Sequence, residues 1–60
     1  MANNLKDLRK KKHITLDMMS VRSTIPSAEY IQIEKGQKEP TDVQLRQIAV
    51  ALGVDVNEIR

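Results

Sequence analysis

The feature that most constrains this chain is its length of 60 residues without a single cysteine. A domain this short buries only about 60% of the surface of its unfolded chain, so many natural domains of this size add disulfides or metal ions. Without cysteine, this chain can form neither a disulfide framework nor a thiolate zinc site. We therefore expect one domain over residues 1–60, stabilised by helix packing or by a partner, with no metal site.

The composition is that of a soluble domain. Hydrophobic residues make up 40% of the chain and charged residues 30%, a balance too apolar for a disordered tail. No stretch approaches the eighteen or so apolar residues of a membrane span, and the N-terminus lacks the apolar region of a signal peptide. The composition predicts a cytoplasmic protein in a reducing compartment, with no membrane partner.

The positive charge is unevenly distributed. Residues 1–30 contain six Lys or Arg and three Asp or Glu, whereas residues 31–60 contain four and five. The excess is concentrated in the run from Arg9 to Lys12. Such a run is typical of a solvated helix C-terminus, and also of a surface that faces a polyanion. Charge alone favours the solvated helix end.

Apolar periodicity predicts helices and no strand. Leu45, Ile48, Ala49 and Leu52 recur at i, i+3, i+4 and i+7, the spacing of one face of a helix. Leu5 indicates an earlier helix, with Leu8 one turn later. Two shorter helical segments, at about 16–23 and 26–35, lie between them.

Capping residues predict where these helices begin and end. Thr15 suits the start of the second helix, and Pro26 suits the first turn of the third. Glycines able to adopt a left-handed conformation follow the third and fourth helices. Capping-box spacing begins the fourth helix, and a last short turn begins after its closing glycine. The remaining predicted boundary residues are Gly36, Thr41 with Gln44, Gly53, and Asp55 with Glu58. The prediction is an all-α bundle of five short helices.

Ordered motifs along nearly the whole chain carry a resemblance to a known family. They are Leu5-Lys6-Asp7-Leu8-Arg9, Ile14-Thr15, the segment from Ala28 to Gly36, Pro40-Thr41, the segment from Ile48 to Val54, and Val56-Asn57-Glu58-Ile59. With this order and spacing, the chain resembles the phage-repressor/Cro-type helix-turn-helix family. The resemblance implies a compact five-helix repressor-like bundle. It also implies that the second and third helices form a helix-turn-helix, with the third helix in the DNA major groove.

The same resemblance implies which residues contact bases. These are Ser27, Ala28 and Gln32 on the third helix, with Glu29 beside them. The Gln32 amide can donate to and accept from adenine together, and Ala28 can touch a thymine methyl group. Glu29 can accept from cytosine, although an N-terminal position in the helix is an equally good explanation of its charge.

Basic residues around these positions suit phosphate contacts, which position a protein on DNA. The resemblance also implies that Arg9 pairs with Glu34 as a structural ion pair between the first and third helices. The expected phosphate contacts are Lys10, Lys11, Lys12, Arg22, Lys35 and Lys38.

The helical stripes also predict the interior. Tyr30, spaced i, i+3 from Ile33, is expected in the core and not as a base-stacking aromatic. The predicted core comprises Leu5, Leu8, Ile14, Met19, Ile25, Tyr30, Ile33, Leu45, Ile48, Ala49, Leu52, Val54 and Ile59.

Several positions depart from the family pattern. Thr24 occupies the place of the usual turn glycine, so the turn is expected to be strained or differently shaped. Leu16 replaces a frequent glutamine, and Met18, Val21 and Ile31 are apolar where polar residues are usual. They leave open an alternative: a protein-binding module on the same fold, antitoxin-like or co-regulatory, that uses these four residues.

No enzymatic activity is expected. His13 is the only histidine, and two glycines are too few for a phosphate-cradling loop. The sequence instead predicts sequence-specific binding of double-stranded DNA by a bacterial or phage transcriptional regulator, a repressor in preference to an activator, without a cofactor. One module reads few bases, so a homodimer on a palindromic operator is expected. Pairing could be weak or DNA-induced, and the chain could be part of a longer regulator.

Overall fold

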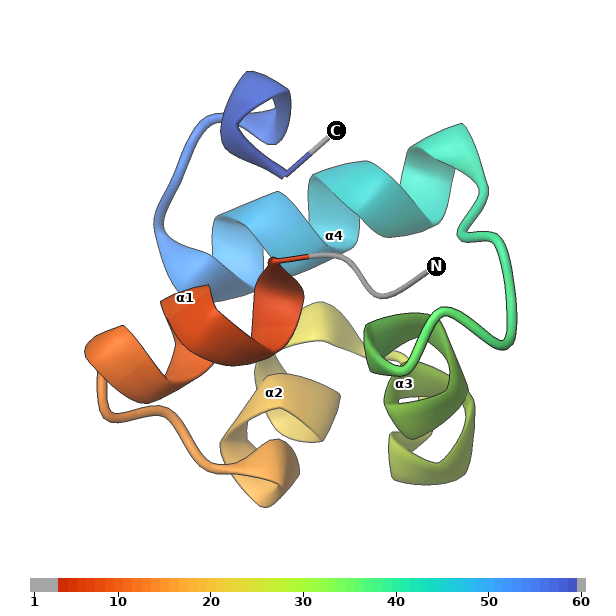
Figure 1. Ribbon diagram of the computed structural model, residues 1–60, viewed down its shortest axis with the longest axis horizontal. Coiled ribbons are helices and arrows are strands. Elements are labelled where there is room, and N and C mark those ends of the chain that lie inside the picture. Colours follow the sequence, from red (N-terminus) through yellow and green to blue (C-terminus); the bar gives the residue numbers. More distant parts are fainter. Residues whose placement is uncertain (1–3, 60) are drawn as a thin grey trace.

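The computed structural model describes residues 4–59 and contains helices and turns in that range, with no strand. The elements are α1 (Leu5–Lys11), α2 (Leu16–Ser23), α3 (Ser27–Glu34), α4 (Asp42–Leu52) and the 3₁₀ helix η1 (Val56–Glu58). Figure 1 shows α4 crossing above α1, α2 and α3, with η1 at the blue end of the chain. The all-α prediction is confirmed. No helix in this range has the length and apolar content needed to cross a membrane.

The longest helix, α4, begins and ends where its capping residues predict. The Thr41 hydroxyl accepts from the Gln44 backbone, and the Gln44 side chain accepts from the Thr41 backbone. At the other end Gly53 takes the left-handed conformation, with φ of 72°. The buried residues of α4 are Ala51 and three of the predicted stripe, Ile48, Ala49 and Leu52, because α2 and η1 both pack against this helix.

The prediction of five helices was wrong at the C-terminal end. Asp55 and Glu58 begin the expected last short turn and form a capping box, but they enclose a single turn of 3₁₀ helix. The backbone amides of Glu58 and Ile59 donate to carbonyls three residues earlier, at 2.9 and 3.2 Å. This i→i+3 pattern closes a tight turn that brings Ile59, 5% exposed, onto the core.

The third helix is shorter than its predicted span of 26–35 by one residue at each end. Pro26 is extended, with ψ of 141°, and precedes the helix while its carbonyl accepts from the Tyr30 amide. Beyond Glu34 and Lys35, Gly36 adopts the left-handed conformation, with φ of 76°. The predicted bounds of the second helix, 16–23, are confirmed.

The helices enclose one hydrophobic core. Ten of the thirteen predicted core residues are buried, and the other three, Leu8, Leu45 and Val54, are only partly buried against the edge of the cluster. Two charged residues, Arg9 and Glu34, are buried with them, as is Ser23.

Candidate nucleic-acid interface

The turn between α2 and α3 is held by serine side chains. The Ser20 hydroxyl donates to the carbonyl of Ile25 at 2.9 Å. The Ser23 hydroxyl donates to the carbonyl of Met19 and accepts from the Ile25 amide. Backbone groups at the end of α2 and in the turn lack partners within a helix, and these serine side chains provide hydrogen bonds for them. These bonds fix how α3 leaves α2.

Thr24 in this turn is left-handed, with φ of 60° and ψ of 17°. The turn was expected to be either strained or differently shaped. It keeps the shape that glycine would give it and is therefore strained, because a β-branched residue occupies a disfavoured conformation. The Thr24 hydroxyl accepts from the Gln47 side chain of α4 at 3.2 Å. That bond ties the turn to the longest helix.

The two sides of α3 differ in exposure. Tyr30, Ile33 and Glu34 are buried on its inner side. Ala28, Gln32 and Lys35 are exposed, and their i, i+4, i+7 spacing aligns them along the outer side. Among the other expected base contacts, Ser27 and Glu29 are half-buried. The Gln32 side chain makes no hydrogen bond within the described range, so its amide is available to a ligand.

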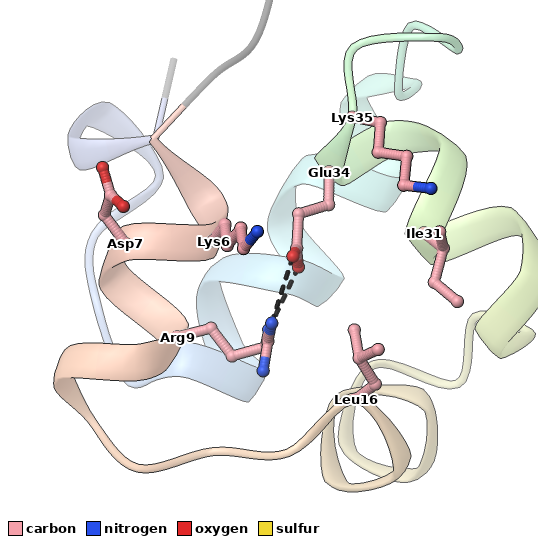
Figure 2. A pocket seen from close by; sticks show the side chains of 7 residues that line it. All are labelled: Lys6, Asp7, Arg9, Leu16, Ile31, Glu34 and Lys35. Carbon is pink, nitrogen blue, oxygen red and sulfur yellow. Dashed lines mark hydrogen bonds and ion pairs between the residues drawn. The ribbon is translucent and has the colours of Figure 1, made fainter.

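Arg9 and Glu34 connect α1 to the C-terminal end of α3. Arg9 Nε and Nη2 donate to the two carboxylate oxygens of Glu34, each at 3.1 Å (Figure 2). Arg9 Nη1 also donates to the carbonyl of Ile14 at 2.9 Å, just before α2. The paired carboxylate raises the pKa of Arg9. A bidentate pair with side chains 10% and 8% exposed fixes α1, the approach to α2, and α3 relative to one another.

Tyr30 lies in the core beneath this ion pair, where the sequence placed it. Burial raises the pKa of its hydroxyl, and the carboxylate of Glu34 adds to the rise. Although these charged groups are near, the hydroxyl has no partner of hydrogen-bonding geometry among residues 4–59. Because its side chain is fully buried, Tyr30 is unavailable for base stacking.

Glu29 is occupied by contacts within the protein. Its carboxylate forms an ion pair with Lys38 at 2.7 Å and accepts from the side-chain amide of Gln44. Lys38 and Gln44 hold the pKa of Glu29 below its usual range. This contact competes with the expected roles of Glu29 at a base and of Lys38 at a phosphate. Sequence reasoning missed it because it joins α3 to the start of α4 across a loop.

The remaining cations expected at phosphates are exposed. Lys10 and Lys11 end α1, Lys12 follows it, Arg22 lies on α2, and Lys35 follows α3. None of these five forms an ion pair within residues 4–59. They are free to neutralise a polyanion.

The four apolar residues of the protein-binding alternative are divided between two hollows. Leu16 and Ile31 face each other in a pocket of about 510 Å³ between α1, α2 and α3 (Figure 2). Met18 and Val21 line a separate hollow, which shares no residue with the first. Leu16 and Met18 are about 200° apart around α2, so they cannot share a face.

Two further features of this region were not anticipated, the position of Lys6 and the backbone conformation of His13. Lys6 lines the pocket of Leu16 and Ile31, and its i, i+3 spacing from Arg9 was the available signal. His13 has a positive φ of 58°, and it ends α1 in the manner of a glycine. Within the described residues, no cluster of His, Asp and Glu has the arrangement of a metal site.

Comparison with known proteins gives one match. A protein-family model described as helix-turn-helix matches residues 5–59. No curated protein sequence and no solved structure matches the chain at a significant level.

Proposed function

The chain belongs to the phage-repressor/Cro-type helix-turn-helix family, a family of DNA-binding transcriptional regulators, and on that premise we propose that it binds double-stranded DNA sequence-specifically with α3 in the major groove. The observation that carries the proposal is the outer side of α3. There Ala28, Gln32 and Lys35 are exposed in line, while the opposite side of the helix is buried.

In this proposal base reading depends chiefly on Gln32. Its amide nitrogen can donate to adenine N7 while its amide oxygen accepts from adenine N6–H, which makes a bidentate contact. Ala28, one turn earlier, has the size and apolar character to contact a thymine methyl group, and Ser27 can bond to a base or a phosphate. Glu29 contributes least, because Lys38 and Gln44 already occupy its carboxylate.

Phosphate contacts position the domain. Lys10, Lys11 and Lys12 approach from the end of α1, Arg22 from α2, and Lys35 from the end of α3. Two copies on a palindromic operator would place their α3 helices one DNA turn apart, about 34 Å. A domain bound in this way blocks access to its site, which supports repression.

Selection of bound duplexes from a random DNA library at two salt concentrations tests the proposal. We expect enrichment of a short, two-fold repeated motif in which each half-site contains an adenine read by Gln32. Affinity for the enriched duplex should fall with salt, with a log–log slope of about −0.9 per phosphate neutralised. Absence of enrichment at both salt concentrations would exclude sequence-specific binding.

A further inference from the structure

A groove on the outside of α2 and α4 shares only Arg22 with the DNA-binding arrangement proposed above. It has a volume of about 310 Å³, and its walls include Arg22, Thr24, Val43, Arg46, Gln47 and Val50. We call it the α2–α4 groove. No residue of α3 lines it, so it is a surface additional to the outer side of α3.

Its walls combine exposed valines with unpaired arginines. Val43 is 61% exposed and Val50 78%, and both belong to the small set of large hydrophobic residues exposed in the described part of the chain. They lie seven residues apart on α4, about 10 Å along one side of the helix. Arg22 and Arg46 are exposed and form no ion pair within residues 4–59. No Asp or Glu lines the groove.

This combination determines the occupant. A second copy bound across a two-fold axis would bring the groove of one protomer, with its Arg22 and Arg46, against the same positively charged groove of the other, with no carboxylate in the groove to compensate. A DNA backbone could meet the arginines but would leave the valines against polar phosphate and sugar. A segment with apolar side chains flanked by carboxylates satisfies both kinds of residue.

We propose that the α2–α4 groove binds an acidic amphipathic helix of a partner protein. Apolar side chains at i, i+3 or i+4, and i+7 of that helix lie against Val43 and Val50, since this repeat matches the spacing of the valines. Its Asp or Glu side chains pair with Arg22 and Arg46. The occupied groove touches Thr24, so the partner is placed beside the turn that orients α3.

The test begins with a display library of random 16-residue peptides selected on the full 60-residue chain. We expect the enriched peptides to be acidic and to carry an apolar i, i+3 or i+4, i+7 repeat. The most enriched peptide is then synthesised with a fluorescent label, and its affinity for the chain is measured by fluorescence anisotropy.

Two variants locate the bound peptide. Arg46→Glu and Val50→Lys should each weaken the labelled peptide about tenfold or more, because one reverses the complementary charge and the other removes an apolar contact. Lys6→Gln, which removes an exposed cation outside the groove, is the matched control and should leave the affinity unchanged. Circular dichroism should show that all three variants melt within a few degrees of the parent chain, since the substituted residues are exposed.

Every other outcome overturns the proposal. Failure to enrich acidic amphipathic peptides, or peptide binding that survives Arg46→Glu, would show that the groove is not their site. Self-association abolished by Val50→Lys in sedimentation would make the groove an interface between copies. The peptide measurements contain no DNA, so their result is independent of whether the proposed DNA-binding function is correct.

Discussion

The inner and outer sides of α3 differ in how far the protein itself satisfies their side chains. On the inner side Tyr30 and Ile33 are buried, and Glu34 is held by two hydrogen bonds from Arg9. On the outer side Gln32 is exposed, and its amide makes no hydrogen bond within residues 4–59. The inner side of this eight-residue helix thus stabilises the fold, and its outer side is available to a ligand. Substitutions on the two sides should therefore affect different measurements.

The largest effect is expected on the inner side, from Arg9→Ala. The variant leaves the carboxylate of Glu34 buried without its partner, and we expect the free energy of unfolding to fall by about 3–5 kcal/mol. Urea denaturation followed by circular dichroism measures the change. For a 60-residue domain this is a large fraction of the total stability.

Its control is the double variant Arg9→Leu with Glu34→Leu. Because neither charge is then buried, we expect much of the lost stability to return. A single-variant loss below about 1 kcal/mol, typical of an exposed ion pair, would contradict the inner side's role in fixing the helices.

The outer side should respond in the opposite manner. Gln32→Ala should change the free energy of unfolding by no more than about 0.5 kcal/mol, as expected of an exposed substitution. It should lower discrimination at one base pair of the selected site by about 1–3 kcal/mol, or about 5- to 150-fold. Competition binding with single-base variants of the site measures this loss. Gln37→Ala, at another exposed glutamine, should leave discrimination intact.

The sequence predicted α4 and the inner side of α3 well, because both depend on local signals. The capping box at Thr41, the glycine at 53 and the apolar periodicity all act within a few residues. The buried Ser23 could not be predicted in this way, because a polar residue enters the core only when nearby backbone groups accept and donate its hydrogen bonds. Hydrophobic patterning contains no information about those bonds.

The least predictable features of the site depend on tertiary structure. The contact of Glu29 with Lys38 and Gln44 exists only because α3 and the start of α4 are brought together. The positive φ of Thr24 was open as one of two outcomes, since the turn length alone does not determine its shape. The outer side of α3 was predictable as exposed, but the DNA ligand that we propose for it rests on family membership and not on packing.

Thr24→Gly tests the turn that joins α2 to α3. Relief of the left-handed conformation should stabilise the protein by up to about 1 kcal/mol, reduced by the lost bond to Gln47 and by glycine's greater freedom in the unfolded chain. Thermal melting measures the effect, and DNA affinity should be unchanged. A destabilised variant would show that the lost Gln47 bond and the freedom of glycine in the unfolded chain together outweigh the backbone strain.

The smallest effect on stability is expected at Glu29, which is half-buried between the inner and outer sides of α3. Its pKa is lowered in the folded protein, so its contribution to stability is present above its unfolded pKa of about 4.3. That contribution is lost as the pH falls through the lower folded value. In Glu29→Gln the free energy of unfolding should therefore fall slightly less steeply as the pH is lowered. Urea denaturation midpoints from pH 6 to 3 measure this dependence. An unchanged dependence would show that the contact with Lys38 contributes nothing.

The most direct test of the division between the two sides of α3 is an isotope-edited nuclear Overhauser measurement on the labelled chain bound to its selected duplex. We predict cross-peaks from the Gln32 side-chain amide and the Ala28 methyl group to base protons of the major groove, and none from the ring of Tyr30. Contacts to DNA protons from α4 in place of α3 would contradict the account.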